Sequence, residues 1–407
     1  MLKTVRNPSF RRIYFVPLLS NLTGSMTWAI NVVYALELGA SITEVNLITT
    51  IWTSMSVLVL VPFGILSDRM GRKPMLLIPT ALTIVGSTIR SLATSPSQLL
   101  VAAFIGALSS DFFTILISMV VDVARPNEQR EAISTLLLFS SIGMVAGPLI
   151  GSILLSFPGI VTRNIYQIDA VAQTCVLAYS FIMIRETKAK TKEKEVFHAS
   201  NVLDLLRKPS FRYLLVMVFL FFYFFGTMNT YIPIHANRNL SLSDAEVSTL
   251  ATFRGLATML IRFSAATFLS RVQPRKLLIL AFTLGGIAAL VSPLASSYPL
   301  LILISFAYGS SFGMTMVLGY TMVSEESTPS NRGTANAVYS VFQSMGSLAV
   351  ASTSSLAEAA GIAPVFLLAG SASLASTIPI SLRRTRQAKG RSDDPDQSSA
   401  SGEKNRP

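Results

Sequence analysis

Long apolar runs constrain the fold of this chain more than any other feature. Apolar side chains make up 51% of the 407 residues, whereas charged side chains make up 13%. A helix needs about 20 apolar residues to cross a bilayer, and the sequence contains about twelve such runs. A water-soluble helical protein is excluded because too few polar helix faces remain to meet water. The predicted spans are residues 13–35, 46–66, 74–93, 98–122, 131–157, 166–184, 213–234, 247–269, 276–295, 299–323, 334–356 and 362–382.

The basic residues of the chain concentrate between the predicted spans. The net charge is +12, from 33 Lys and Arg against 21 Asp and Glu. If the N-terminus is cytoplasmic, most basic residues fall on the cytoplasmic side, whereas Arg90, Arg163 and Arg238 fall on the outer side. Basic residues concentrate in this way in the cytoplasmic loops of membrane proteins. The charge predicts a multi-pass protein of the cell membrane with both termini in the cytoplasm, and it does not indicate a nucleic-acid partner.

The chain contains two related halves. The phrase RNPSFRR near the start recurs as RKPSFRY halfway along the chain, each time just before a predicted span. After the first span of each half, the sequence offers a Ser-x-x-Glu capping box, with Ser41 and Glu44 in one and Ser243 and Glu246 in the other. These features predict a parallel repeat. The predicted divisions are a six-helix bundle at 1–184, a cytoplasmic connector at 185–212, a second six-helix bundle at 213–382 and a disordered cytoplasmic tail at 383–407.

The segment GILSDRMGRKP joins the second and third predicted spans. Glycine permits a tight turn there, basic side chains stay at the inner face of the membrane, and the Asp68 carboxylate can lie against a helix N-terminus. The segment resembles the signature loop of the major facilitator superfamily, Gly-x-x-x-Asp-Arg-x-Gly-Arg-Arg/Lys. The residues that carry the resemblance are Gly64, Asp68, Arg69, Gly71, Arg72 and Lys73.

This resemblance implies an all-α integral membrane protein with twelve transmembrane helices in two six-helix bundles, the major facilitator fold. It also implies that the loop stabilises the outward-facing state by docking at the cytoplasmic end of the eleventh span. In that family an aspartate at the end of the fourth span pairs with the loop arginines, and Asp122 occupies this position. The second-half counterpart, FLSRVQPRK, lacks the aspartate and the glycine.

A stripe of small residues lies in the fifth predicted span, within GMVAGPLIGS. Gly143, Gly147 and Gly151 recur every four residues, which allows another helix to approach closely, and Pro148 loosens the helix. The pattern resembles the antiporter motif of drug–proton exchangers, although Ser152 replaces its last glycine. Ordinary packing of small residues between helices is the alternative explanation.

One departure from drug–proton exchangers concerns the fourth span. Such exchangers carry an arginine four residues before a glycine in the outer half of that span. Here Ala102 stands four residues before Gly106. If transport is coupled to protons, another group must therefore take part.

Charged residues inside the spans are costly in lipid and mark candidate sites for coupling or substrate binding. Asp111 lies in the middle of span four, and a buried acid can exchange a proton near neutral pH. Arg254 and Arg262 lie on one face of span eight and could bind an anionic substrate or pair with Asp111. Asp169, one turn into span six, is expected at the membrane interface rather than in a binding site.

The other candidates for the substrate path are polar and aromatic residues on spans one, seven and ten, which the resemblance places around a central cavity. Hydrogen bonding between helices is the alternative role for the neutral polar side chains. These candidates are Trp28, Asn31, Phe222, Phe225, Asn229 and Tyr308.

The sequence predicts neither an enzyme nor a cofactor. The segment GSSFG at 309–313 fits a nucleophile pattern but lies in a predicted span with no strand before it, so it is interpreted as a helix contact. The two histidines, His198 and His235, lie outside the core of the spans. Zinc, phosphate-loop and dinucleotide patterns are absent from the sequence.

Together these features predict a secondary active transporter that works by rocking of two halves around a midplane site. The favoured function is proton-coupled efflux of amphipathic, drug-like small molecules by a monomer in the lipid bilayer. One alternative is a symporter or uniporter for a metabolite such as a sugar or an organic anion, which Arg254 and the missing span-four arginine favour. A non-transporting receptor or scaffold is disfavoured because the signature loop is intact.

Overall fold

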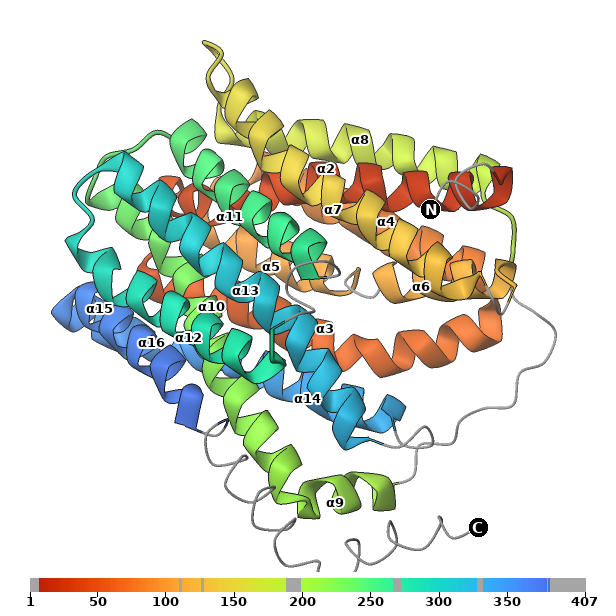
Figure 1. Cartoon of the computed structure of the whole chain (residues 1–407). Coiled ribbons are helices and arrows are strands. Elements are labelled where there is room, and N and C mark those ends of the chain that lie inside the picture. Colours follow the sequence, from red (N-terminus) through yellow and green to blue (C-terminus); the bar gives the residue numbers. More distant parts are fainter. Residues whose placement is uncertain are drawn as a thin grey trace, which may run out of the picture.

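The computed structural model describes residues 7–109, 112–125, 128–187, 199–265, 272–327, 332–378 and 380, and this part of the chain is helical without strands. The helices of the first half are α2 (Pro8–Glu37), α3 (Ile42–Met70), α4 (Arg72–Leu92), α5 (Pro96–Ala107), α6 (Phe112–Val123), α7 (Gln129–Leu155) and α8 (Thr162–Met183). The short helix α9 (Ala199–Arg207) precedes the second half (Figure 1).

The second half has α10 (Pro209–Arg238), α11 (Asp244–Ala265), α12 (Pro274–Val291), α13 (Tyr298–Glu326), α14 (Arg332–Leu348), α15 (Ser354–Ala360) and α16 (Ala363–Ala375). Short 3-10 segments follow α12 at Ser292–Leu294 and α14 at Ala349–Thr353. Each predicted span falls on one or more of these helices. Among the described residues, seven helices are long and apolar enough to cross a membrane by length and composition.

Local sequence signals account for several helix starts. Asn7 accepts a hydrogen bond from the backbone N–H of Ser9 at 3.0 Å and begins α2. Before α3, Glu44 accepts from the Ser41 N–H at 2.8 Å while the Glu44 N–H donates to the Ser41 hydroxyl at 3.1 Å. Ser243 and Glu246 form the equivalent pair of bonds before α11 in the second half. Repeated capping boxes thus fix the same helix start in both halves.

The predicted fourth span, 98–122, is divided between α5 and α6. The Ser109 hydroxyl donates to the carbonyl of Gly106 at 2.5 Å, and the N–H groups of Leu108 and Ser109 bond to carbonyls three residues back. Such local bonds compete with the regular helical pattern and tighten the last turn. Prediction of one continuous helix was therefore wrong at this point.

The two ends of the bundle differ in how the halves meet. We call the end with residues 38–41, 156–161 and 239–243 the outer end, after the predicted orientation, and the opposite end, with residues 185–187, the inner end. One large apolar cluster combines outer-end residues of the first half, such as Val33, with many residues of the second half. A smaller cluster near the inner end contains first-half residues only among those described. The halves therefore share a core toward the outer end.

Candidate functional site

Two adjoining cavities lie between the helices, with volumes of about 490 and 410 Å³. First-half side chains line most of the larger cavity, whereas both halves line the smaller one. The rings of Trp28 and Trp52, with centroids 5.1 Å apart, border both. The cavities therefore form one continuous region between the halves. The residues that line both are Asn21, Gly24, Trp28, Trp52, Ser141, Met144 and Arg262.

A cationic cluster occupies the second-half side of this region. Arg254 of α11 donates hydrogen bonds to the amide oxygen of Asn229 on α10 and to the hydroxyl of Tyr308 on α13, the latter at 3.3 Å. Gly309 lies against the backbone of Arg254, so α11 and α13 approach closely. The structure thus brings three predicted candidates together from three helices. Because both partners are neutral, the Arg254 charge is not balanced by a described carboxylate.

Aromatic rings form the apolar wall of the smaller cavity. Phe225 stacks on Phe312, with centroids 4.1 Å apart and planes 13° apart, and both rings line the cavity. Phe222 packs edge-on against Phe225 at 6.1 Å but is outside the lining of both cavities. Arg262 borders both cavities and lies about two turns beyond Arg254 on α11, toward the inner end. The described candidates therefore divide into residues that line the two cavities and two supporting rings, those of Phe222 and Tyr308.

A buried polar cluster that the sequence did not single out lies in the first half. Asp169 of α8 is only 2% exposed and accepts hydrogen bonds from the Ser87 hydroxyl of α4 and from Gln173 Nε2, the latter at 3.4 Å. Gln173 Nε2 also donates to Thr23 Oγ1 at 2.9 Å. Asp169 borders the larger cavity, so the expectation that it lies at the membrane interface was wrong. The Ser87 hydroxyl of α4 and the Gln173 amide of the same helix make burial of the carboxylate tolerable.

Arg90 reaches the larger cavity from the last turn of α4. Its guanidinium donates to the carbonyl of Ala102 at 3.5 Å and lies next to Gly106, where an added Cβ would come within 3.3 Å of it. An arginine therefore does lie beside Gly106, although α4 supplies it rather than the fourth span. Asn31 borders the same cavity and accepts a hydrogen bond from the Tyr166 hydroxyl at 3.4 Å.

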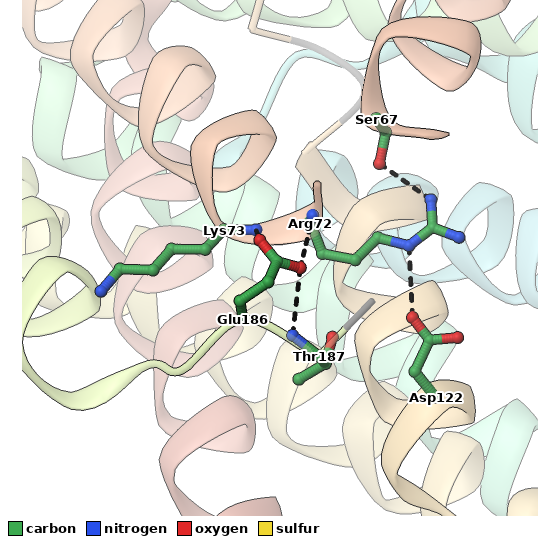
Figure 2. A network of polar contacts seen from close by, with 6 residues as sticks. All are labelled: Ser67, Arg72, Lys73, Asp122, Glu186 and Thr187. Atoms are coloured by element: carbon green, nitrogen blue, oxygen red, sulfur yellow. Dashed lines mark hydrogen bonds and ion pairs between the residues drawn. The ribbon is translucent and has the colours of Figure 1, made fainter. Parts of the chain in front are cut away.

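The signature loop forms a compact polar network (Figure 2). Gly71 has φ = +103°, a conformation that favours glycine, and it ends α3 and begins α4 within one residue. Arg72 Nε lies 3.3 Å from the Asp122 carboxylate, and Arg72 Nη1 donates to the Ser67 hydroxyl at 2.8 Å. Gly64 lies within α3, and the side chain of Asp68 lies outside the described part of the chain.

Glu186 of the connector completes this network, and no motif in the sequence pointed to it. Its carboxylate accepts hydrogen bonds from the backbone N–H groups of Arg72 at 2.8 Å and Lys73 at 3.0 Å (Figure 2). These N–H groups belong to the first turn of α4, where an acidic side chain is favoured. The Lys73 ammonium donates to the carbonyl of Phe181 at 2.7 Å. The connector is thereby tied to the loop.

The glycine stripe of α7 packs against two neighbouring helices. Gly143 and Gly147 lie against the backbone of α2, so a side chain at either position would meet backbone atoms. Nearer the outer end, the Pro148 carbonyl accepts from the Ser248 hydroxyl of α11 at 2.7 Å, and Ser152 donates to the Ala245 carbonyl at 2.8 Å. The stripe therefore serves packing within the first half and contact with the second half. Gly151 lies against Met26 and Ser248.

Further hydrogen bonds join the halves near the outer end. The Asn46 amide of α3 donates to the Tyr231 hydroxyl and to the Ser354 hydroxyl, each at 2.9 Å. The Thr43 N–H donates to the Glu358 carboxylate at 3.1 Å. These contacts and the shared apolar cluster close the outer end in this conformation.

Other predicted features remain outside this geometry. Asp111 lies outside the described residues, and so does the tail from 381 onward. Arg69 belongs to the last turn of α3. Within the described residues, no group of three or more His, Cys, Asp or Glu side chains is placed to hold a metal ion.

Comparison with known proteins identifies the family. The family model described as Major Facilitator Superfamily matches residues 13–243 and 218–402. Multidrug resistance protein MdtL from Escherichia coli O81 (strain ED1a) is 25% identical over 300 residues, which cover 70% of this chain and 74% of the relative. MdtL from Shigella dysenteriae serotype 1 (strain Sd197) has the same identity and coverage.

Solved structures share the fold at low identity. The nucleoside transporter NupG has a TM-score of 0.76 and 12% identity, with 92% of this chain and 98% of that chain covered. The human organic anion transporter MFSD10 (TETRAN) has a TM-score of 0.64 and 16% identity, with coverage of 92% and 99%. The predicted all-α membrane protein with the major facilitator fold is thus confirmed. The chain belongs to the major facilitator superfamily and is a multi-pass membrane transporter of small molecules, not an enzyme.

Proposed function

We propose that this transporter exports amphipathic, drug-like small molecules in exchange for protons, by rocking of its two halves about the cavity between them. The observation that carries the proposal is the lining of that cavity. Both halves contribute large rings, including Trp28, Trp52, Phe225 and Phe312, next to a few polar groups. Such a mixture suits molecules with an apolar body and a polar or charged end. The similarity to proteins named for multidrug resistance supports export.

The signature loop is proposed as the gate of the rocking motion. Gly64, Asp68 and Arg69 complete the motif on α3, and Gly71, Arg72 and Lys73 turn the chain into α4. Arg72 joins this loop to Asp122 at the end of α6. A movement of the loop would therefore shift the inner ends of α3, α4 and α6.

Coupling and topology belong to the same proposal. Asp111 is the proposed proton carrier, because a carboxyl in mid-membrane can take up a proton when substrate leaves. The Gly143–Gly151 stripe with Pro148 is proposed to keep the halves packed so that substrate and protons are exchanged and neither leaks across the membrane alone. We further propose that a monomer works in the cell membrane with both termini in the cytoplasm, as the distribution of basic residues favours.

A second candidate function is transport of organic anions. The cavities contain Arg90, Arg254 and Arg262, and the described lining holds a single carboxylate, that of Asp169. Arginine side chains with neutral or no described partners attract a carboxylate or sulfonate. The arginines thus favour an anionic or zwitterionic amphipath over a purely cationic one.

Export of a charge-matched series separates these candidates. Purified protein in proteoliposomes would be given one fluorescent ring system bearing an ammonium, a neutral or a sulfonate group. The proposed function predicts that a proton gradient drives accumulation of at least one member and that substrate addition releases protons. Preference for the sulfonate would select the second candidate. Equal flux with and without a gradient would contradict exchange.

A further inference from the structure

Two carboxyl groups meet across the two halves at the outer end. Glu37 is the last residue of α2, and Asp244 is the first residue of α11. Between them lies Thr162, the first residue of α8, which is fully buried. The Thr162 hydroxyl oxygen is 2.6 Å from an Asp244 carboxyl oxygen and 3.2 Å from a Glu37 carboxyl oxygen. One hydroxyl therefore serves a carboxyl from each half.

Proton counting shows that this arrangement lacks a donor. A threonine hydroxyl has one proton and donates one hydrogen bond, whereas ionised carboxylates only accept. With both acids ionised, the Thr162 hydroxyl can donate to only one carboxylate, the exposed Glu37 carboxylate must then accept from water, and two negative charges lie close together. With one acid protonated, that acid becomes a donor and the repulsion ends. Direct hydrogen bonds among the hydroxyl and both carboxyls are therefore possible only when the pair holds a proton.

We propose that Glu37 and Asp244 share one proton when the outer end is closed, and that this proton holds the two halves together there. When the halves separate at this end, each carboxyl returns to water and the pair releases the proton. The inference rests on the proposed rocking motion and adds a proton site that acts on it. This site is distinct from the cavity, since neither acid lines it.

The titration of Glu37 supports this geometry. Glu37 lies two residues beyond the predicted span 13–35. Burial, then the hydrogen bond to Asp244 and the Asp244 charge, raise the pKa of Glu37 from 4.5 to about 7, while the Thr162 hydrogen bond acts in the opposite direction. A raised pKa means that the closed conformation takes up a proton. Its advantage is therefore present at low pH and is lost as pH rises through about 7.

Other titratable groups near this pair have partners elsewhere. Glu246 accepts from the N–H and hydroxyl of Ser243. Arg163 donates to the Ala93 carbonyl at 2.8 Å, and the Tyr34 hydroxyl donates to the Arg90 carbonyl at 2.7 Å. The remaining groups on the packed helices are Tyr166, His235 and Arg238, and the structure describes no hydrogen bond or ion pair from them to either acid.

Pulsed electron–electron resonance between the halves tests the proposal directly. The free Cys175 would be replaced by Ser, and spin labels would be placed at the exposed outer-end positions Ser97 and Ser296, one on each half. The full chain in nanodiscs, without substrate, would be measured at pH 5.5 and pH 8. With pKa values of about 7 closed and 4.5 separated, the closed-to-open ratio should fall about 25-fold.

Three variants make the test specific. Glu37→Gln and Asp244→Asn keep a hydrogen-bonding side chain that cannot ionise, so each should remove most of this pH response. Glu358→Gln is the matched control, because Glu358 also bonds across the halves, to the Thr43 N–H, but has no carboxyl partner among the described residues. It should keep the response of the parent protein.

The outcomes are distinct. An unchanged distance distribution in the parent protein between pH 5.5 and pH 8 would overturn the proposal. So would a full response in both Glu37→Gln and Asp244→Asn. Because the measurement uses no substrate and no flux, failure of export would leave this result standing. Conversely, proton-driven export without the distance response would remove this site alone.

Discussion

The cavity residues show which parts of the site can be identified from the sequence one position at a time. Arg254, Asn229 and Tyr308 could be selected from the sequence because polar groups inside spans are costly. The sequence could not predict that they form one cluster, because they come from three different helices, α10, α11 and α13. Asp169 was misjudged for a related reason. Its burial depends on Ser87, a hydrogen-bond partner 82 residues away in the chain.

Arg254→Gln tests the cationic cluster. Removing a guanidinium that can bind a substrate anion should weaken binding of the sulfonate probe by about 10- to 100-fold, since charged hydrogen bonds contribute about 1.5–3 kcal/mol. The cationic probe should lose less. Fluorescence titration of purified protein measures both. Arg238→Gln, at an exposed arginine in the last turn of α10, is the control and should bind like the parent. Equal losses for both probes would contradict the anion assignment.

Asp122→Asn tests the signature-loop ion pair. The Asp122 and Arg72 side chains are 8% and 19% exposed, so the lost charge leaves a largely buried guanidinium. We expect a destabilisation of about 2–4 kcal/mol and transport below about a tenth of the parent rate, from thermal unfolding and flux assays. Asp204→Asn breaks an exposed pair with Arg207 and should change neither. Similar behaviour of both variants would reduce Asp122 to a surface acid.

Helices as elements were predicted well where apolar runs and caps agree. The capping boxes at Ser41 and Ser243 set the same helix start in both halves. The division of span four escaped prediction because the Ser109–Gly106 bond is a local competition that an apolar run conceals. The glycine stripe of α7 was visible as a pattern, yet its partners α2 and α11 were not.

Gly147→Ala tests whether the α7 stripe fixes the contact with α2. An added methyl group would meet the Leu22 carbonyl and the Ser25 hydroxyl. We expect a loss of about 1–3 kcal/mol from overpacking, visible as a lower unfolding temperature in detergent. Gly24→Ala, where an added Cβ meets nothing within 4 Å, is the matched control and should be neutral or slightly stabilising. Comparable losses at both positions would indicate a general intolerance of these helices to substitution.

The whole molecule was predictable as an architecture but not as a conformation. Long apolar runs, the repeated basic phrase and the signature loop predict the major facilitator fold without any contact being known. The closure of the outer end depends on pairs far apart in sequence, such as Asn46 with Ser354 and Thr162 with Asp244. Such pairs carry no local signal, and they define which conformation is observed.

A reversible lock at the outer end tests the central claim most directly. The hydroxyls of Ser152 on α7 and Thr249 on α11 lie 2.7 Å apart across the halves. Cysteines at both positions, in a Cys175→Ser background, would allow a disulfide that holds this end closed. Flux would be measured in proteoliposomes after oxidation and again after reduction, with Ser152→Cys alone as the control.

Alternating access between the halves predicts that oxidation stops transport, that reduction restores it, and that the single-cysteine control is unaffected. The locked protein should still bind substrate from the inner side, because the cavity remains. Full flux through the oxidised double variant would contradict the account.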